Sequence, residues 1–259
     1  MRIATFNING IKARSEALVD WLRAAEPDVV CLQEIKSTDE TFPHEIFDGL
    51  GYTIATHGQK SFNGVAILSR LGLEDVTHGL PGDDSDEQAR WIEATVVGTR
   101  AVRICGLYLP NGNPVPGPKY DYKLAWMERM RARVETLLVG EEPFVLAGDY
   151  NIIPQDEDAA RPEAWREDAL ALPDSRAAFR KIVNLGLTEA FRARVRGPGH
   201  YSFWDYQAGA WQRNNGIRID HMLLSPQAAD LLRDSGIDKD VRGHDKPSDH
   251  VPVWIDIDA

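Results

Sequence analysis

The feature that most constrains the fold of this chain is a pattern of strand, helix and strand that occurs twice. Each copy has an apolar strand, a helix with apolar residues three and four positions apart, and a second apolar run. The segments are residues 2–8, 15–25 and 28–32 in the first copy and residues 101–109, 126–138 and 143–148 in the second. Two strands joined through a helix are usually parallel neighbours in one sheet. The repetition therefore predicts an α/β fold with a duplicated core.

Further strands and helices are predicted between and after these two units. The strands are residues 63–70, 90–97, 200–204, 217–224 and 251–257, and the helices run from Asp174 or Ser175 to Gly186 and from Pro226 to before Gly236. Neither a linker-like composition nor a low-complexity tract interrupts the sequence. Residues 1–259 are therefore predicted to form a single domain.

The composition predicts a protein without membrane segments. Of the 259 residues, 43% are hydrophobic and 27% charged, and no apolar run has the length of about eighteen residues that indicates a spanning helix. The N-terminal residues enter a strand-like sequence directly, without the pattern of a secretory signal. Cys31 and Cys105 lie in apolar runs and are expected to be buried and reduced. We expect a bacterial cytoplasmic protein and no membrane partner.

The formal net charge of −11 argues against a nucleic-acid partner when it is taken alone, because contacts to phosphates depend on Lys and Arg. Two considerations weaken this objection. Acids that surround a bound cation count as negative in the net charge but not in the electric field of the complex. Basic residues can also be concentrated locally, as in the clusters Arg192, Arg194 and Arg196 and Lys119 with Lys123. Ordinary solvated charge explains each cluster equally well.

Polar side chains occur at the ends of the predicted strands, where sheet proteins build their sites. These residues are Asn7, Asn9, Glu34, Tyr108, Asn111, Asp149, Asn151 and Asp220. Each one alone has a structural explanation, because Asn and Asp side chains satisfy the backbone of turns. In an extended segment, however, Asp149 and Asn151 point to the same side and can share one ligand.

The carboxylates of this set indicate a cation site if they lie together. Glu34, Asp149, Asp220 and Asp249 would repel one another in a buried pocket unless a partner neutralised them. Oxygen ligands without a Cys or His spacing motif fit a hard ion, so Mg²⁺ is expected, with Mn²⁺ as a possible substitute. The sequence therefore predicts a catalytic pocket that binds a cation.

His250 differs from the other histidines, each of which has a structural explanation. It follows Asp249 in "KPSDHVPVW", immediately before an alternating apolar strand. Asp220 is a second candidate partner if the two strand ends meet. A carboxylate on one ring nitrogen would fix the tautomer and leave the other nitrogen to face a phosphate oxygen or a water.

Taken in order, these residues resemble the exonuclease III family of apurinic/apyrimidinic endonucleases, within the endonuclease/exonuclease/phosphatase superfamily. The motifs are "TFNING" (5–10), "LQEIK" (32–36), "NGVAILS" (63–69), "GLYLPNG" (106–112), "LAGDYNI" (146–152), "SFWDYQ" (202–207), "GIRIDHMLLS" (216–225) and "KPSDHVPVW" (246–254). They extend over nearly the whole chain, which makes the resemblance specific, whereas "GDYN" or "SDH" alone would be weak.

The resemblance implies a four-layer α/β sandwich, in which two mixed β-sheets pack face to face with helices on the outside. It implies a metal bound near Asn7, Glu34, Asp249, Asp149 and Asn151. By the family pattern, Asp149 activates the attacking water or joins a second metal, and Asn151 orients the phosphoryl group. His250, paired with Asp220, stabilises the transition state, and Tyr108 donates its hydroxyl nearby. The family pattern leaves open whether Asp149 or His250 is the base.

The implied activity is metal-dependent hydrolysis of phosphodiesters in DNA repair. It comprises incision 5′ to abasic sites in duplex DNA, 3′-5′ exonuclease activity and cleaning of blocked 3′ ends, by a protein expected to be monomeric. The expected substrate-binding residues are Asn111, Lys119, Phe203, Trp204, Trp211 and Arg213. Core packing is an alternative explanation for Phe203 and Trp204, whereas the polar neighbours of Trp211 favour a substrate contact.

Two other functions are compatible with parts of the sequence. A phosphatase or phosphodiesterase of the same superfamily, acting on a small phosphorylated substrate, would share the catalytic core. The motif coverage and the aromatic loop after residue 200 argue against it. A catalytically inactive DNA-binding or scaffolding module would have substituted acids, whereas every expected acid, amide and imidazole is present.

Overall fold

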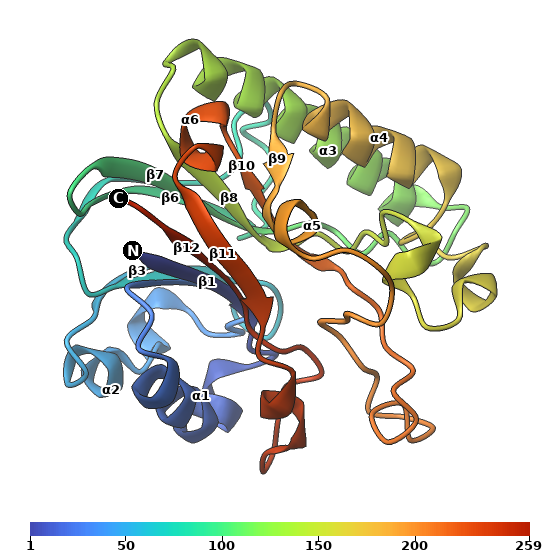
Figure 1. Ribbon diagram of the computed structural model, residues 1–259, viewed down its shortest axis with the longest axis horizontal. Coiled ribbons are helices and arrows are strands. Elements are labelled where there is room, and N and C mark those ends of the chain that lie inside the picture. Colours follow the sequence, from blue (N-terminus) through green and yellow to red (C-terminus); the bar gives the residue numbers. More distant parts are fainter.

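The protein has four layers, as the computed structural model of residues 1–259 shows (Figure 1). Two mixed sheets of six strands each pack against one another, and helices cover the outer faces. The expected α/β sandwich is confirmed. None of the helices combines the length and the apolar character that a membrane crossing requires.

The first sheet has the strand order β11 (Leu232–Ile237), β12 (Val253–Ile257), β1 (Arg2–Asn7), β2 (Val29–Gln33), β4 (Val65–Ser69) and β3 (Thr53–His57). The second sheet has the order β5 (Leu73–His78), β6 (Trp91–Val97), β7 (Ala101–Tyr108), β8 (Phe144–Asp149), β10 (Asp220–Leu224) and β9 (Thr188–Glu189). The α-helices are α1 (Ile11–Ala25), α2 (His44–Asp48), α3 (Pro118–Val139), α4 (Pro173–Val183), α5 (Ala190–Arg194) and α6 (Pro226–Ala229). The short 3₁₀ helices are η1 (Asp39–Thr41), η2 (Asp156–Asp158), η3 (Pro162–Trp165) and η4 (Lys239–Gly243).

The two sheets repeat one another, as the duplicated sequence pattern predicts. Strands β1 and β2 are parallel neighbours joined through α1, and β7 and β8 are parallel neighbours joined through α3. All other neighbours in both sheets are antiparallel. Each parallel pair therefore brings two strand ends, with their polar residues, to the same edge of its sheet.

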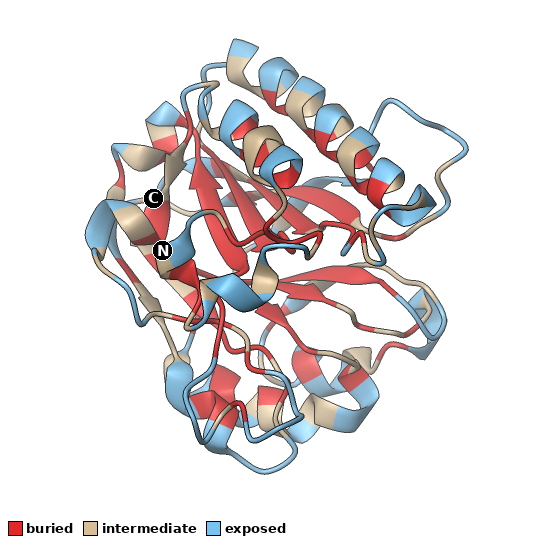
Figure 2. Ribbon diagram, turned by 90° about the vertical axis from the view of Figure 1, so that its right-hand side faces the viewer, coloured by how far each residue is buried: buried red, intermediate tan, exposed pale blue.

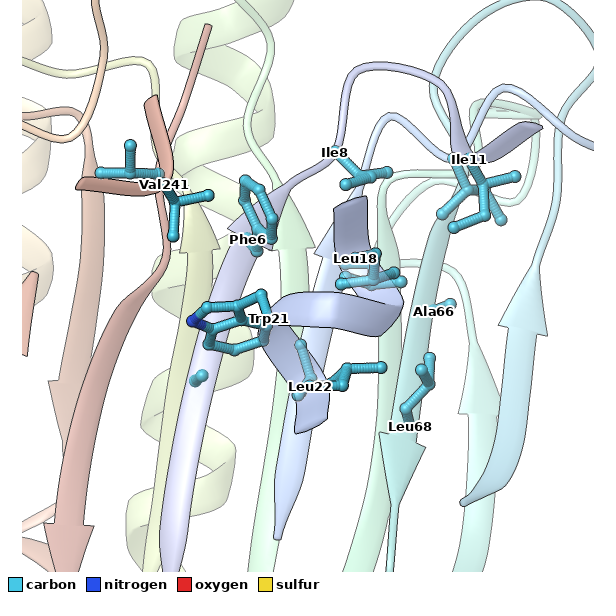
Figure 3. Packing of buried hydrophobic residues seen from close by; sticks show 14 of the residues in the cluster. Phe6, Ile8, Ile11, Leu18, Trp21, Leu22, Ala66, Leu68 and Val241 are labelled. Carbon is cyan, nitrogen blue, oxygen red and sulfur yellow. The ribbon is translucent and has the colours of Figure 1, made fainter. Parts of the chain in front are cut away.

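Burial of apolar side chains holds the layers together. Figure 2 shows that the central strands of both sheets are buried while the outer helices expose one face. Between the sheets, residues such as Ile67 and Ile104 form an apolar cluster. On the outer face of the first sheet, Leu18, Trp21 and Leu22 of α1 pack in one cluster with residues of β1 and β4 (Figure 3). Each such side chain contributes about 1.5–3 kcal/mol when fully buried.

Several predicted elements differ from the structure. Residues 200–204 form no strand, and only Phe203 makes isolated bridges, to Ile217 and His250. The predicted strand 217–224 begins at Asp220. The predicted helix from Pro226 is a single turn, and the chain then forms β11, which pairs with β12.

The sequence prediction also missed two edge strands, β3 and β5. All six residues of β5 are at least partly exposed, so no buried face imposes an alternating pattern on its sequence. The long helix α3 begins at Pro118, eight residues before the first apolar position used to predict it. Proline at the first helical position is favourable because its missing N–H would have no partner there.

Candidate active site

A pocket of about 250 Å³ lies at the edge where strands of both sheets end. It is lined by Glu34, Tyr108, Asn111, Asn113, Asp149, Asn151, Trp165, Asp168, Leu170, Phe203, Ile219, Asp249 and His250. The structure thus brings together six of the predicted catalytic and metal-binding residues with two of the predicted substrate-binding residues, Asn111 and Phe203. Asn7 and Asp220 lie behind this lining, each hydrogen-bonded to a residue in it.

The amide of Asn7 links the two sheets at this edge. Its Nδ2 donates to Glu34 Oε1 and to Asp149 Oδ2, both at 2.9 Å. Its Oδ1 accepts from the backbone N–H of Asn9 at 3.0 Å. Asn7 was expected near the metal, and in this arrangement it holds the two carboxylates with its nitrogen. The ends of β1, β2 and β8 are therefore joined by one side chain.

Glu34 also has a basic partner, Lys36, whose ammonium lies 2.9 Å from Glu34 Oε2. Burial tends to raise the pKa of Glu34, but the hydrogen bond from Asn7 and the charge of Lys36 outweigh it and hold the pKa below its usual range. Lys36 also donates to Asn9 Oδ1 at 2.5 Å, and Asn9 Nδ2 donates to Asp249 Oδ1 at 3.0 Å. Glu34 and Asp249 are thus connected through a single lysine and a single amide.

Asp220, His250 and Asp149 form a line of hydrogen-bonding groups. The Nδ1 of His250 donates to Asp220 Oδ2 at 2.9 Å, and its Nε2 lies 3.7 Å from Asp149 Oδ2. Asp220 and Asp149 are also directly paired across β10 and β8. The hydroxyl of Ser202 donates to Asp220 Oδ2 at 2.6 Å. The predicted pairing of His250 with Asp220 is therefore present.

Burial and neighbouring charges shift the pKa values of Asp149 and His250. Burial raises the pKa of Asp149 to about 7, and the charge of Asp220 adds to this effect although His250 opposes it. Burial alone would lower the pKa of His250, but the carboxylates of Asp220 and Asp149 outweigh it and raise that pKa. At neutral pH, His250 therefore carries a proton on Nε2, which faces Asp149 and the pocket.

A second network fixes the loop that follows β8. Asn151 has a left-handed backbone with φ 46°, its N–H donates to Asp149 Oδ1 at 2.8 Å, and its Oδ1 accepts from Asn111 Nδ2 at 3.1 Å. The buried ammonium of Lys123 donates to the carbonyls of Asn111 and Asn151 at 3.0 and 2.7 Å. Burial lowers the pKa of Lys123 to about 7. Lys123 therefore positions two backbone segments of the pocket rather than a phosphate.

Tyr108 lies at the end of β7 beside Glu34 and Asp149. Burial and these two carboxylates raise its pKa well above the usual value, so its hydroxyl keeps its proton and can act as a donor. The guanidinium of Arg90 lies 4.7 Å from the centre of its ring. The ring is thereby held against the wall of the pocket.

The backbone around these residues is unusual. Asn9, Glu34, Lys36 and Asn151 are non-glycine residues with φ between 46° and 51°. Left-handed conformations cost such residues energy, and they are concentrated at functional sites. The polar residues after β1, β2 and β8 are therefore held in a conformation that local preference alone does not favour.

The three predicted aromatic substrate residues, Phe203, Trp204 and Trp211, differ in how far they are buried. Phe203 is half-buried and lines the pocket, with its ring edge-on to His250 at a centroid distance of 5.0 Å. Trp204 is fully buried, so the prediction of a substrate contact is wrong for this residue and the packing explanation applies. Trp211 is half-buried and packs edge-on against Trp204 at 5.0 Å. Part of the Trp211 ring remains exposed, and its contact with a substrate stays a prediction.

Lys119 and Arg213 lie outside the pocket lining, and both are exposed. Lys119 belongs to the first turn of α3. Contacts of these two residues to a long substrate remain predictions.

Sequence reasoning missed five residues of the pocket lining, which are Asn113, Trp165, Asp168, Leu170 and Ile219. Asn113 Nδ2 donates to Asp168 Oδ1 at 3.0 Å, and the N–H of Ala169 donates to Asn113 Oδ1 at 3.2 Å. These bonds tie the loop after β7 to the loop after β8. Neither loop has a periodic pattern that could have revealed the contact. Lys123 could have been found, because it lies in the apolar stripe of α3 with Trp126, Met130 and Val134.

The donor set of the pocket fits a hard divalent cation. Glu34, Asp149 and Asp249 provide carboxylate oxygens at the lining, and Lys36 and His250 neutralise only part of their charge. Ligand atoms of Asp149, Asp220 and His250 lie within 4.8 Å of one another, so these three residues could also hold an ion. We favour a position near Glu34 and Asp249, because His250 and Asp220 already satisfy one another by a hydrogen bond.

Comparison with known proteins is consistent with this site. The family described as "Endonuclease/Exonuclease/phosphatase family" matches residues 4–250. The chain is 34% identical over 268 residues to exodeoxyribonuclease III of Haemophilus influenzae, with 99% of both proteins covered. An AP endonuclease from Archaeoglobus fulgidus has a similar structure, with a TM-score of 0.95, 34% identity and complete coverage of both chains. A 3′ phosphatase, NExo from Neisseria, bound to a product DNA hairpin, has a TM-score of 0.95 and 36% identity, also with complete coverage.

Proposed function

Because this chain belongs to the endonuclease/exonuclease/phosphatase family, we propose that it is a metal-dependent DNA repair nuclease. The proposed reactions are incision of duplex DNA 5′ to abasic sites, 3′-5′ exonuclease action and removal of blocking groups from 3′ ends. Relatives named for each of these activities cover essentially the whole chain. We propose Mg²⁺ as the cation, with Mn²⁺ as a substitute, and a monomeric single-domain protein that acts in a bacterial cytoplasm.

The observation that carries the proposal is the line formed by Asp220, His250 and Asp149 beside the carboxylates of Glu34 and Asp249. A protonated imidazole and a buried carboxylate both face one pocket of about 250 Å³. Hydrolysis of a phosphodiester needs a group that activates water and a donor for the charge that develops on the phosphoryl oxygens. This pocket contains both.

The shifted pKa values of Asp149 and His250 indicate which residue acts as the base and which as the hydrogen-bond donor. Asp149, whose pKa is raised to about 7, is suited to accept a proton from the attacking water near neutral pH. His250, whose pKa is raised by two carboxylates, is suited to donate a hydrogen bond to a phosphoryl oxygen. Asp220 holds the imidazole through Nδ1. Of the two candidates for the base, we therefore infer that Asp149 serves.

The remaining polar residues orient the phosphoryl group and its neighbours. Asn151 and Asn111 are hydrogen-bonded to each other and line the pocket, and Tyr108 offers its hydroxyl at the end of β7. Glu34 and Asp249, with Asn7 nearby, would hold the cation. When bound, the cation supplies positive charge that stabilises a non-bridging oxygen and the leaving 3′ oxygen.

We infer that the apolar part of the pocket receives the deoxyribose of an abasic site. Phe203, Trp165 and Leu170 lie in the lining beside His250. Apolar side chains of this kind can pack against a sugar, while the polar groups opposite them orient it. Half-buried Phe203 is the residue that we expect to contact this sugar.

The test uses an end-labelled duplex with one tetrahydrofuran abasic analogue, resolved on a denaturing gel. With Mg²⁺ we expect incision immediately 5′ to the lesion, and EDTA should abolish it. The same duplex without the analogue controls for exonuclease action, and a 3′-phosphate duplex tests the end-cleaning activity. Absence of any cleavage with Mg²⁺ or Mn²⁺ would contradict the proposal and favour a small phosphorylated substrate.

A further inference from the structure

Arg14, near the start of α1, contacts three different loops at the rim of the pocket. Its Nε donates to the carbonyl of Pro247 at 3.2 Å, and one terminal amino group donates to the carbonyl of Asn9. The other terminal amino group donates to the hydroxyl of Tyr206 at 2.9 Å. Tyr206 itself donates to the same Pro247 carbonyl, also at 2.9 Å. Arg14 and Tyr206 are here called the rim clamp.

The rim clamp holds the two loops that present the proposed cation ligands. Asn9 donates through Nδ2 to Asp249 Oδ1 at 3.0 Å and through its backbone N–H to Asn7 Oδ1 at 3.0 Å. Pro247 is two residues before Asp249, and Ser248 between them donates to the Asn7 carbonyl at 2.7 Å. A shift of Arg14 would therefore move the Asn9 and Pro247 carbonyls and, through them, Asp249.

The other end of the rim clamp belongs to the loop 205–215, which carries Arg213 and Trp211. Half of Tyr206 is exposed, so a ligand on this loop can reach its ring. The guanidinium of Arg242 lies 4.9 Å from the ring centre and donates to the Trp204 carbonyl at 3.1 Å. The ring is thus held from the protein side by Arg242 while its hydroxyl points to the cation loops.

A purely structural role does not account for this arrangement. The hydroxyl of a half-exposed tyrosine can bind water at little cost, and one hydrogen bond contributes only about 0.5–1.5 kcal/mol. Here the hydroxyl instead accepts from Arg14 and donates to a backbone carbonyl beside a proposed cation ligand. Three segments that are far apart in sequence meet at this one group.

We propose that the rim clamp couples DNA contact at the loop 205–215 to cation binding at Asp249, with Arg14 and Tyr206 as positioning residues. This inference rests on the proposed function. Coupling between two sites is reciprocal, so DNA should tighten cation binding by the same factor by which the cation tightens DNA binding. Factors of about 5 to 150 are typical of such coupling, and we expect a value in this range.

The test compares the Mn²⁺ affinity of the protein with and without DNA, from the electron paramagnetic resonance signal of free Mn²⁺. The DNA is a duplex with one tetrahydrofuran analogue and phosphorothioate linkages that block cleavage. The variants are Tyr206→Phe, which removes only the hydroxyl, and Arg14→Met. The matched control is Tyr122→Phe, because the Tyr122 hydroxyl contacts Asp86 and no residue of the pocket.

In the wild-type protein and in Tyr122→Phe, DNA should tighten Mn²⁺ binding at least fivefold. In Tyr206→Phe this factor should fall below about twofold, and Arg14→Met should also weaken Mn²⁺ binding without DNA. Cleavage by Tyr206→Phe of an unblocked duplex should need more Mn²⁺ for half-maximal rate, with kcat restored at saturating Mn²⁺. A merely structural defect would not be restored in this way.

Two results would overturn the inference, and they are distinguishable from failure of the proposed function. If Tyr206→Phe and Arg14→Met keep the wild-type factor, or if the wild-type protein binds Mn²⁺ and DNA independently, the rim clamp does not couple the two. Incision by the wild-type protein would leave the proposed function intact in either case. If the wild-type protein neither binds Mn²⁺ nor cleaves DNA, both the proposed function and the inference fail.

Discussion

Two clusters of largely buried charged side chains both include residues at the start of β10, and they are built in opposite ways. The paired cluster consists of Asp158, Glu189, Arg192, Arg218 and His221. In it, Arg218 lies 2.8 Å from Asp158 and 3.0 Å from Glu189, and Arg192 lies 2.5 Å from Asp158. The acid cluster consists of Asp149, Asp220 and His250, and contains no arginine or lysine. Arg218 and Asp220, one from each cluster, are only two residues apart.

The difference appears in the pKa values of the carboxylates. Burial tends to raise the pKa of Glu189, but Arg218 and His221 outweigh it and lower the pKa to about 2. Burial raises the pKa of Asp149 to about 7 because a single imidazole and an amide do not compensate for it. A carboxylate that is buried with its charge only partly balanced costs stability. The acid cluster therefore leaves negative charge in the pocket, which a cation held beside it by Glu34 and Asp249 would balance, whereas the paired cluster is balanced by its own arginines.

The largest effect is expected for Asp149→Asn, which removes the charge of the acid cluster at nearly constant shape. Cleavage of the abasic duplex should fall by at least about 10² to 10⁴, the contribution of a well-placed general base. The melting temperature of the cation-free protein at pH 8 should rise, because an uncompensated buried charge is gone. A variant that cleaves at the wild-type rate would remove Asp149 from the chemistry.

Arg218→Met should have the opposite effect on stability. It leaves Asp158 and Glu189 without their shared partner, and breaking a buried pair from one side costs about 3–5 kcal/mol. Unfolding in urea measures this loss. The double variant Arg218→Met/Glu189→Gln is the control, since it should be more stable than the single one. Equal stability of Arg218→Met and the wild-type protein would mean that the paired cluster has no stabilising role.

The pH dependence of stability should also separate the clusters. Asp149 keeps its proton in the folded state up to about pH 7 but loses it near pH 4 when unfolded, so its contribution to stability falls as pH rises between these values. Glu189 has a lowered folded pKa, so its contribution is present above about pH 4.3 and is lost as pH falls toward 2.

Melting curves in EDTA from pH 3 to pH 8 check both contributions. Subtracting the curve of Asp149→Asn from that of the wild-type protein should leave a decline between pH 4 and pH 7. The curve of Glu189→Gln should instead differ most above pH 4.3. A difference of 1 kcal/mol corresponds to about 2–4 °C in a protein of this size. Identical difference curves for the two variants would contradict the distinction.

The smallest effect is expected for Ser202→Ala. The Ser202 hydroxyl donates to Asp220 and accepts from the N–H groups of Ile219 and Asp220. Its removal should cost about 1 kcal/mol in stability and reduce kcat several-fold, because His250 loses part of its support. Steady-state kinetics on the abasic duplex would show this. A loss as large as that of Asp149→Asn would mean that Ser202 acts in the reaction itself.

The sequence predicted those strands and helices whose apolar residues recur at a regular spacing. The alternation of Val253, Ile255 and Ile257 became β12, and both parallel strand pairs formed as expected. It did not predict β11, because edge strands need only one partner and "LRDSGI" has no apolar alternation. The prediction that the strand ends meet rested mainly on the family resemblance and on the polar residues that follow each strand.

The sequence predicted site residues well where a residue type is rarely found in a core, and poorly where the type occurs both in cores and in binding sites. Carboxylates and His250 in an apolar context indicated a site, and the structure brings them to one pocket. A tryptophan fits a core or a substrate equally well, and only burial identified Trp204 as a core residue. Lys123 was interpreted with Lys119 either as a local basic cluster or as ordinary solvated charge, because the sequence does not show its contacts to the carbonyls of two distant loops.

The central claim is that the excess negative charge of the pocket is balanced by a divalent cation held by Glu34 and its neighbours. Isothermal titration of Mg²⁺ into EDTA-treated protein at pH 7.5 tests this most directly, with Glu34→Gln as the matched variant. The account predicts saturable binding to the wild-type protein and a loss of at least tenfold in affinity for Glu34→Gln. Equal binding by the two proteins, or no binding by either, would contradict it.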